Sequence, residues 1–533
     1  MTNLPSTDAI QKSSMYDYMR SCNEGCESDI ALICKGYKLS YGELFKHIDA
    51  VALALQSFGV KPGDTVALCS LSMPETIVSF YALNKIGATI ASVDPRKPLS
   101  EVDAYMEEVS PCLTLMLDVF APKFEVAKAW KGGACVLLPS GSVAADTVPN
   151  VVPWMDLLKK ASASCHPEGS PPVPFDSGST AVLMHTSGTT GFPKRVMLTN
   201  GNFNSIAAQY MTAFDFERQK TFLSIIPFFL CYGLNINVHL PLCAGVTAVL
   251  VPDFAASRFA DILMEAKANY VAGMPYFFEQ LVRKANEQQT NLSFLEIVAC
   301  GGDFLKPDAE KRLNAMLEQA GSPAKVIKGF GMTELCSTAV TCTPGHNPIG
   351  SVGLPLPLNE VRIVGIEDSQ PMGHGETGQI CISGPSLMKG YLNNEEATRK
   401  VIFYLDGKRW IRTGDAGYVD EEGNLYVTGR IKRSFMRQKA KVYPEFIEAV
   451  ISEHESVRSC AVVGRVVDEN EADPVAFVVP RSDCNESFLR EELSEACVDG
   501  LAEFAVPTEI VFVDALPLTP AGKVDYRALE EMA

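Results

Sequence analysis

The sequence predicts an α/β protein with a large N-terminal domain of βαβ-type sheets flanked by helices and a small, mobile α+β C-terminal domain. Short β-rich runs alternate with helix-length amphipathic runs, as in DTVALCS, MPETIVSFYALNKIG and ATIASVD within residues 64–94. This alternation indicates βαβ units and a largely parallel sheet covered by helices. The chain of 533 residues is also too long for one hydrophobic core, so at least one smaller domain is expected.

Two segments predict where the chain is divided. Residues 161–179, ASASCHPEGSPPVPFDSGS, are rich in Pro, Ser and Gly and predict a surface connection. Near residue 430 a hairpin-like segment passes into a basic one, so we predict domains 1–430 and 431–533. In the second, PEFIEAVISEH predicts a helix with Pro444 at its first position, and SCAVVGRVV and VAFVVP predict strands.

Composition and charge narrow the class of protein. Apolar residues at 47% and charged residues at 21% are typical of a globular enzyme. A formal net charge of -18 argues against nucleic acid or an anionic membrane as the main partner, so an anionic substrate would need a local basic site. The first twenty residues lack the apolar core of a signal peptide, and no run reaches the roughly 18 apolar residues of a spanning helix, which predicts a cytoplasmic protein without stable membrane insertion.

A loop at residues 185–195, HTSGTTGFPKR, follows the apolar run TAVLM. Gly188 and Gly191 allow the backbone to approach a ligand closely, and Lys194 adds a point charge suited to phosphate. Hydroxyl donors come from Thr186, Ser187, Thr189 and Thr190. Because a strand-like segment follows Lys194, the pattern differs from a P-loop and predicts strand, phosphate loop, strand, with a polar surface hairpin as the alternative.

The loop resembles the phosphate-loop signature of the acyl-adenylate-forming enzymes, the superfamily of acyl- and aryl-CoA ligases, firefly-type luciferases and peptide-synthetase adenylation domains. Four further stretches match the motifs of this superfamily in the same order: CGGDFL at 300–305, GFGMTE at 329–334, RTGDAGYVDEEGNLYVTGR at 412–430 and LPLTPAGKVDYRAL at 516–529. Each stretch alone suits a turn or a solvated charge. Five in one order cover nearly the whole chain and identify it as a member.

The resemblance implies an ATP site and roles for its residues. Phe330 would stack near adenine, Thr333 would bond the α-phosphate, Glu334 would hold Mg²⁺, Asp415 would bind the ribose hydroxyls and Arg430 would assist it. The implied ATP- and AMP-binding residues are Thr186, Ser187, Gly188, Thr189, Thr190, Gly191, Lys194, Gly301, Gly302, Asp303, Gly329, Phe330, Gly331, Met332, Thr333, Asp415 and Arg430.

The implied activity is an AMP-forming acid–thiol ligase that uses ATP, Mg²⁺ and CoA. The catalytic residues would be Thr186, Lys194, Glu334 and Lys523, of which Lys523 would reach the carboxylate and the α-phosphate. The C-terminal domain would then turn about a hinge at Lys432 so that one site serves two steps.

The acyl group is expected in the segment IPFFLCYGLNINVHLPLCAG, which resembles the acyl-binding segment of aryl- and fatty-acyl-CoA ligases, with Leu230 replacing a frequent histidine. The segment lacks an aspartate that could pair with a substrate ammonium. A hydrophobic monocarboxylate, fatty or aryl, is therefore expected. The expected acyl-binding residues are Phe229, Leu230, Leu234, Gly301 and Gly329.

Several positions depart from the family pattern. Arg195 stands where a glycine is usual, and it fits either a solvent-facing strand residue or an additional phosphate contact. Lys439 occupies a glycine position on the face that admits the thiol, and Phe446 replaces a glutamate. His185 lies beside the phosphate loop and could line the acyl or nucleotide site, but a lone histidine at a strand end is more often structural.

These departures leave the thiol acceptor open between CoA and the phosphopantetheine arm of a carrier protein. Six basic residues between Arg430 and Lys441 suit the phosphates of CoA, an acidic carrier protein or a solvated face. A catalytically inactive nucleotide-binding relative is the alternative of another class. The presence of Lys194, Glu334 and Lys523 argues against it, because binding alone needs neither a magnesium ligand nor a mobile lysine.

Overall fold

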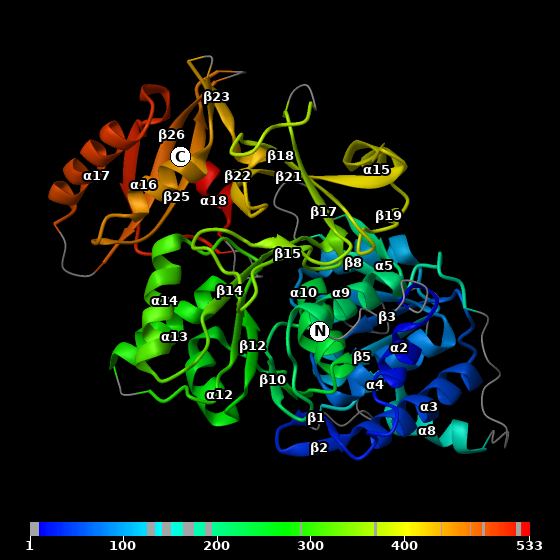
Figure 1. Ribbon diagram of the computed structural model, residues 1–533. Coiled ribbons are helices and arrows are strands. Elements are labelled where there is room, and N and C mark those ends of the chain that lie inside the picture. Colours follow the sequence, from blue (N-terminus) through cyan, green and yellow to red (C-terminus); the bar gives the residue numbers. More distant parts are fainter. Residues whose placement is uncertain are drawn as a thin grey trace.

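The computed structural model describes residues 10–124, 134–140, 151–163, 175–186, 194–287, 290–366, 370–438, 440–468, 471–481, 485–518 and 524–533. A large lower region contains two helix-covered sheets, a smaller antiparallel sheet lies above them, and the C-terminal region lies to one side (Figure 1). Within the described ranges, no helix has both the length and the apolar character needed to cross a membrane.

The first sheet has eight strands and contains the predicted βαβ unit. Its order is β19 (Gly390–Tyr391), β9 (Arg195–Leu198), β8 (Val182–His185), β4 (Thr89–Val93), β3 (Thr65–Cys69), β5 (Leu113–Leu117), β6 (Ala134–Leu138) and β7 (Val152–Pro153). Strands β3 and β4 are parallel and are joined by α4 (Pro74–Ile86), which confirms the prediction for residues 64–94. Only β9 and β19 run antiparallel to their neighbours.

The second sheet has nine strands and supplies the other half of the large region. Its order is β16 (Leu354–Pro355), β15 (Val340–Thr341), β14 (Val326–Phe330), β13 (Ile297–Cys300), β12 (Tyr270–Gly273), β10 (Thr221–Ser224), β11 (Thr247–Leu250), β1 (Ile30–Cys34) and β2 (Tyr37–Ser40). The strands from β14 to β1 are parallel. The carboxyl ends of β13 and β14 therefore lie side by side.

Helices cover and connect these two sheets. They are α2 (Met15–Ser21), α3 (Tyr41–Ser57), α5 (Leu99–Val109), α6 (Ala121–Phe124), α8 (Trp154–Ala163), α9 (Asn200–Ala213), α10 (Cys231–Leu234), α11 (Leu240–Cys243), α12 (Phe259–Ala266), α13 (Pro275–Glu287) and α14 (Pro307–Gln319). Phe80 of α4 meets Phe228 edge to face, with ring centroids 5.3 Å apart. Both rings belong to one continuous core that includes residues of both sheets, so the sheets form one packed unit.

A five-stranded sheet follows and is antiparallel throughout, unlike the βαβ pattern expected up to residue 430. It consists of β17 (Glu360–Val364), β18 (Gly378–Ser383), β21 (Lys408–Val419), β20 (Ile402–Leu405) and β22 (Leu425–Arg430), with α15 (Glu395–Val401) beside it. The connections from β20 to β21 and from β21 to β22 are short hairpin turns, which cannot return the chain to a parallel strand.

The C-terminal region has a core of its own. Its strands are β23 (Phe435–Arg437), β24 (Ala440–Val442), β25 (Val457–Val466), β26 (Ala472–Pro480) and β27 (Glu509–Phe512), and its helices are α16 (Pro444–Ser452), α17 (Glu486–Gly500) and α18 (Tyr526–Met532). Alternate residues of β25 and β26 pack on opposite faces: Val462 and Val478 under α16 and α17, and Val463 and Phe477 under α18. The predicted helix at Pro444 and both predicted strands are confirmed.

The two predicted boundaries have different outcomes. Residues 161–163 of the expected connection belong to α8, while residues 164–174 lie outside the described residues. Strand β22 ends at Arg430, directly before a 3₁₀ turn at Ile431–Arg433. The division at residue 430 stays a prediction. The separate core of the C-terminal region agrees with it.

Candidate active site

The neck of the predicted phosphate loop is closed by two hydrogen bonds. Strands β8 and β9 pair with His185 opposite Arg195. Beyond this pair, the Thr186 amide donates to the Lys194 carbonyl at 3.0 Å, and the Lys194 amide donates to Thr186 Oγ1 at 3.1 Å. The strand, loop, strand prediction is confirmed at the neck, whereas Ser187, Gly188, Thr189, Thr190 and Gly191 lie outside the described residues.

A cation and a carboxylate from two separate motifs meet at this neck. The ammonium of Lys194 lies 4.6 Å from the centroid of the Tyr391 ring, and the Tyr391 hydroxyl donates to Glu334 Oε1 at 2.7 Å. Burial, followed by the charge of Glu334, raises the pKa of Tyr391, so the phenol keeps its proton and remains a donor. The predicted residues Lys194 and Glu334 are thus brought together by a tyrosine that the motif analysis missed.

No motif in the sequence identified Tyr391. It lies on the short strand β19, which pairs with β9 through Gly390 opposite Met197 and Tyr391 opposite Val196. The pairing joins positions nearly 200 residues apart, and YLNN is an ordinary turn-like sequence. The only available signal was an aromatic residue next to a glycine, which is too common to indicate a site.

Glu334 fits the requirements of a magnesium ligand. It is buried on a 3₁₀ turn, Thr333–Leu335, and its Oε2 accepts no hydrogen bond from the described side chains. Within the same ranges, no group of three potential metal-ligating side chains occurs. Mg²⁺ commonly binds proteins through one or two carboxylates and takes its other ligands from phosphates and water. A single carboxylate beside the predicted phosphate loop agrees with this coordination of Mg²⁺.

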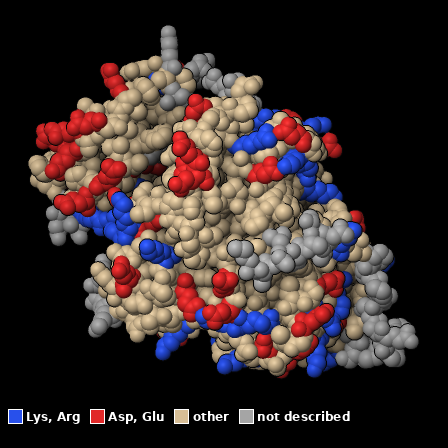
Figure 2. Space-filling model, viewed as in Figure 1, with Lys and Arg blue, Asp and Glu red and all other residues tan. Residues whose placement is uncertain are grey.

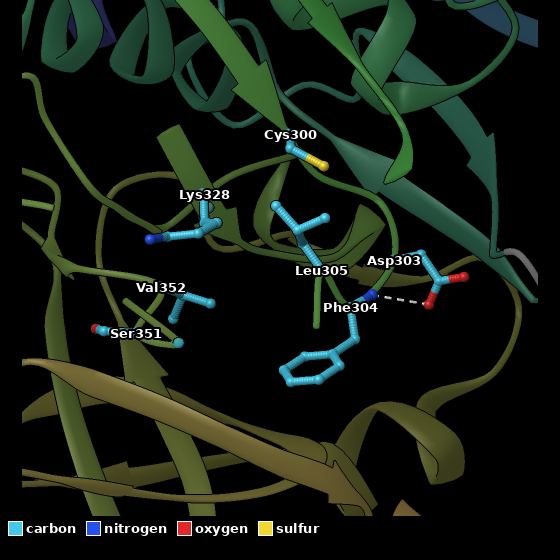
Figure 3. A pocket seen from close by; sticks show the side chains of 9 residues that line it. Cys300, Asp303, Phe304, Leu305, Lys328, Ser351 and Val352 are labelled. Atoms are coloured by element: carbon cyan, nitrogen blue, oxygen red, sulfur yellow. Dashed lines mark hydrogen bonds between the residues drawn. The ribbon is translucent and has the colours of Figure 1, made fainter. Parts of the chain in front are cut away.

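The ends of β13 and β14 form a small pocket (Figure 3). Its lining residues are Cys300, Asp303, Phe304, Leu305, Lys328, Gly329, Gly350, Ser351 and Val352. The pocket includes the predicted residues Asp303 and Gly329. Gly302, directly before Asp303, has φ +81°, which favours glycine, and a Cβ at Gly331 would collide with the carbonyl oxygen of Ser337. The backbone here is therefore closely packed in a way that only glycine permits.

A buried ion pair supports one wall of this pocket. Lys328 and Glu310, whose side chains are 4% and 1% exposed, form an ion pair. The Lys328 ammonium also donates to the Pro348 carbonyl at 3.0 Å, and Glu310 Oε2 accepts from the Gly350 amide at 3.0 Å. The pair thus fixes the segment 348–352, whose last three residues line the pocket.

Asp415 and Arg430 are direct neighbours on β21 and β22, as the predicted ribose site requires. Arg430 Nε lies 3.0 Å from Asp415 Oδ1, and the Asp415 carboxylate is largely buried while the arginine is half exposed. Their sheet is joined to the pocket wall, because the Val352 amide and the Ser351 hydroxyl both donate to the Leu425 carbonyl at 2.9 Å. The ribose pair and the pocket are therefore held on connected segments.

The predicted acyl-binding side chains differ in their exposure. Phe229 is buried beneath the guanidinium of Arg96, which lies 4.6 Å from its ring centroid. Leu234 is fully buried in the main core, whereas Leu230 keeps partial exposure. Tyr232 of the same segment reaches the end of β13, where a Cβ at Gly301 would lie 3.2 Å from its hydroxyl oxygen. The assignment of these residues to an acyl site stays a prediction, and Tyr232 joins them.

Comparison with known proteins decides the family. The AMP-binding enzyme family matches residues 19–392, and the C-terminal domain of the same enzymes matches residues 446–523. The chain belongs to the AMP-binding enzymes. This is the acyl-adenylate-forming superfamily implied by the motifs, and the curated relatives place the chain in its acyl- and aryl-CoA ligase branch.

Relatives of this AMP-binding enzyme match along most of its length. A long-chain-fatty-acid–CoA ligase of Bacillus subtilis is 28% identical over 93% of this chain and 90% of its own. A 2-succinylbenzoate–CoA ligase of Listeria innocua is 28% identical over 94% and 96%. Two solved structures share the fold: ATP-bound MatB of Rhodopseudomonas palustris, with TM-score 0.85, 24% identity and coverage of 98% and 99%, and an anthranilate CoA ligase with anthranoyl-AMP, with TM-score 0.85, 20% identity and coverage of 98% and 98%.

Arg195 of this AMP-binding enzyme does not face solvent, so that interpretation is wrong. The residue is 8% exposed, its Nε lies 3.1 Å from Glu108 Oε2, and its guanidinium lies 4.6 Å from the centroid of the Tyr105 ring. Because α5 already supplies a carboxylate, no additional phosphate contact is needed to explain the arginine. Neighbouring His185 lies against Tyr105, and burial followed by the charge of Arg195 lowers its pKa to about 3, so it stays neutral and structural.

The arginines of the basic segment 430–441 make ion pairs within the chain, and the part this segment plays toward a thiol acceptor stays a prediction. Each arginine has its own carboxylate: Arg430 pairs with Asp415 at 3.0 Å, Arg433 with Glu448 at 2.6 Å and Arg437 with Asp473 at 3.0 Å. The side chains of Lys432, Lys439 and Lys441, and all of Lys523, lie outside the described residues. Phe446 is 45% exposed.

The Tyr391 contact predicts a selective loss of MgATP affinity. Tyr391→Phe removes the hydrogen bond to Glu334 but keeps the ring beneath Lys194, and a hydrogen bond to a charged group contributes roughly 1.5–3 kcal/mol, about tenfold or more in affinity. We expect the Kd for MgATP to rise by about tenfold, measured by isothermal titration calorimetry. The Kd for AMP, which lacks the β- and γ-phosphates, should stay unchanged. Equal losses for both nucleotides would contradict the assignment of Glu334 and Lys194 to the phosphate end.

The buried Lys328–Glu310 pair predicts a large effect on stability. Lys328→Met leaves the Glu310 carboxylate buried without its cation, and we expect the free energy of unfolding to fall by about 3–5 kcal/mol. The matched control is Lys311→Met, because Lys311 pairs with Asp308 on the exposed surface of the same helix and should contribute about 0–1 kcal/mol. Urea denaturation measures both values. Equal free energies of unfolding for the two variants would show that the buried pair does not stabilise the fold more than the exposed pair does.

Proposed function

We propose that the protein activates a hydrophobic carboxylic acid, fatty or aryl, with ATP and Mg²⁺ and transfers the acyl group to CoA. The observation that carries this proposal is the contact of Lys194, Tyr391 and Glu334 at the neck of the phosphate loop. This contact supports a site in which Lys194 would bind phosphate and the buried Glu334 carboxylate would hold Mg²⁺. The Bacillus and Listeria relatives, named as CoA ligases, support the choice of reaction.

In the first step, a carboxylate oxygen of the acid attacks the α-phosphorus of ATP, the bond to the β-phosphate oxygen breaks, and pyrophosphate leaves. Negative charge builds up on the transferring group, so donors and cations fixed around it lower the barrier. Thr186 and Lys194 would hold the β- and γ-phosphates with the rest of the loop, and Lys523 would bridge the two reacting anions. Bound to Glu334, Mg²⁺ would screen the phosphate charge.

The nucleoside end of ATP would lie at the β13 and β14 ends. Phe330 would stack near adenine, Thr333 would bond the α-phosphate, and Asp415, held by Arg430, would accept from the ribose hydroxyls. The glycine-rich backbone there, whose residues are Gly301, Gly302, Asp303, Gly329, Gly331 and Met332, would form the walls. Support comes from the pocket that includes Asp303 and Gly329.

The acyl group would lie between Leu230 and Tyr232 and the end of β13. The carboxylate of a bound acid must reach the α-phosphate, and the closeness of Tyr232 to Gly301 connects the acyl segment with the nucleotide pocket. The segment 226–245 contains no acidic residue, so an amino-acid ammonium would lack a partner there. This supports a fatty or aryl acid.

In the second step, the thiol sulfur of CoA attacks the acyl carbonyl carbon and the thiol proton is lost. The bond between the acyl carbon and the phosphate oxygen breaks, so AMP leaves. The domain 431–533 would turn about a hinge at Lys432 between the steps and remove Lys523 from the site. CoA is preferred to a carrier protein because the Bacillus and Listeria relatives are named as CoA ligases.

Pyrophosphate exchange tests the proposed adenylation. Labelled pyrophosphate should enter ATP when a fatty or aryl acid is added, and CoA should then accelerate AMP release. If no acid of a broad panel supports exchange, the protein is an inactive nucleotide-binding relative. Exchange that occurs without acceleration of AMP release by CoA would favour a carrier protein as the acceptor.

Separating the two steps tests Lys523. Lys523→Ala should lose exchange by at least about a hundredfold, because it removes a charge that contacts both reacting anions. The variant should still consume supplied acyl-AMP with CoA. Lys38→Ala, which changes an exposed lysine of β2, serves as the control and should behave as wild type. Normal exchange by the Lys523 variant would refute its role.

A further inference from the structure

Two consecutive buried residues, Cys336 and Ser337, have positive φ angles. The angles are +55° and +111°, and the two residues follow the 3₁₀ turn Thr333–Leu335 directly. Every other non-glycine residue with positive φ in the described ranges is exposed, as is usual for a surface turn. A left-handed backbone is costly for an L residue other than glycine and persists where its surroundings hold it. The structure around Cys336 must therefore hold this conformation.

The conformation of Cys336 decides how the chain leaves the turn that carries Thr333 and Glu334. The Cys336 amide donates to the Thr333 carbonyl at 3.0 Å, which closes the turn. The chain then folds back over Gly331, where a Cβ would overlap the Ser337 carbonyl oxygen, and continues into β15. The reversal that presents Thr333 and Glu334 therefore depends on the left-handed residue behind them.

A buried carboxamide from another element holds Cys336. Asn235 Nδ2 donates to the Cys336 carbonyl oxygen at 2.8 Å and to Cys336 Sγ at 3.4 Å. Asn235 is fully buried, and its Oδ1 accepts no hydrogen bond from the residues that the structure describes. Burial of a polar side chain is costly unless its hydrogen bonds are made. The described hydrogen bonds of this carboxamide all go to Cys336, which indicates that holding Cys336 is its role.

Asn235 begins a π-helical turn in the acyl segment, Asn235–His239, between α10 and α11. Such turns are rare and often lie at functional sites. Asn237 of the same turn binds elsewhere, because its Oδ1 accepts from two backbone amides directly after β10 at 3.1 and 3.2 Å. Asn235 thus joins the acyl segment to the turn of Glu334, whereas Asn237 joins it to the end of β10.

The thiol of Cys336 does not explain this arrangement. Burial, followed by a hydrogen bond with Cys231, raises the pKa of the Cys336 thiol, against a smaller lowering by Asn235. The thiol therefore stays protonated, and a buried, protonated thiol is a poor nucleophile. The backbone of Cys336, and not its sulfur, is what Asn235 controls.

We propose that Asn235 is a positioning residue for adenylation, which keeps Cys336 left-handed so that Thr333 and Glu334 can meet the α-phosphate and Mg²⁺. The inference rests on the proposed function, which supplies those two roles. The same hydrogen bond fixes the acyl segment relative to the turn, so it also sets the distance between a bound carboxylate and the α-phosphorus. A misplacement of about 1 Å in such a geometry can cost roughly a hundredfold in rate.

Rescue by glycine tests the proposal. Asn235→Ala should lower the kcat of acid-dependent pyrophosphate exchange by about five- to thirtyfold, the factor that corresponds to the cost of a left-handed L residue. Adding Cys336→Gly should restore the rate to within about threefold of that of Cys336→Gly alone, because glycine adopts positive φ without support. Both positions are buried and uncharged, so the acidic and basic side chains mixed over the visible surface in Figure 2, which set the field met by ATP, stay unchanged.

Asn237→Ala is the matched control. It removes the hydrogen bonds of an equally buried asparagine on the same π-helical turn without touching Cys336. Cys336→Gly should not restore the rate or the free energy of unfolding that Asn237→Ala loses. Rescue of both asparagine variants would show a general gain of stability and overturn the proposal. Should Asn235→Ala fail to fold, Asn235→Leu keeps a similar volume without a donor and takes its place.

The outcomes separate the positioning role from the function. A normal exchange rate in Asn235→Ala, or a lowered rate that Cys336→Gly does not restore, overturns the role of Asn235 and leaves the function intact. If the wild type exchanges pyrophosphate with no acid, the function fails, and calorimetry of MgATP binding then decides whether Asn235 holds the turn. The same loss and rescue should occur in the Kd for MgATP, and an unchanged Kd in Asn235→Ala would refute it.

Discussion

The double pairing of strand β9 is the constraint on which the candidate site depends. One edge of β9 pairs with β8 and closes the phosphate loop, and the other edge pairs with β19 and delivers Tyr391 to Glu334. β9 itself begins with the buried Arg195, whose ion pair with Glu108 ties the strand to α5. Backbone hydrogen bonds fix the register, so the backbone at Lys194 is held beside the strand that carries Tyr391.

The sequence predicted the local features of this site well and its long-range contacts poorly. Thr186 and Lys194 lie within one motif, so their positions at the loop neck follow from a turn between two strands. Tyr391 and Glu108 lie in unremarkable sequence and reach the site only through pairing and packing across the fold. The same distinction explains the fold: the βαβ unit at 64–94 is a local pattern, whereas the antiparallel sheet from β17 to β22 depends on hairpin turns within the region expected to be parallel.

The ion pairs of the basic segment 430–441 show that the charge of a segment cannot be inferred from its sequence alone. The run of basic residues after Arg430 is conspicuous in the sequence, but Glu448 of α16 pairs with Arg433 and Asp473 of β26 pairs with Arg437. Sequence proximity therefore indicates charge density only where folding supplies no counter-charge.

The C-terminal region differs in its internal packing from its contacts with the large region. Residues of β25 and β26 bury both faces against helices of the same region, so this unit keeps its packing wherever it lies relative to the large sheets. By contrast, Lys306 of the large region makes polar contacts with the C-terminal region: one with the Ser452 hydroxyl and one with the Cys460 thiol. Polar contacts of this kind exchange with water at small net cost, whereas an apolar core does not. The proposed turn of this region about Lys432 between the two reaction steps requires this combination, because the contacts that break must be replaceable by water while the core of the moving unit stays intact.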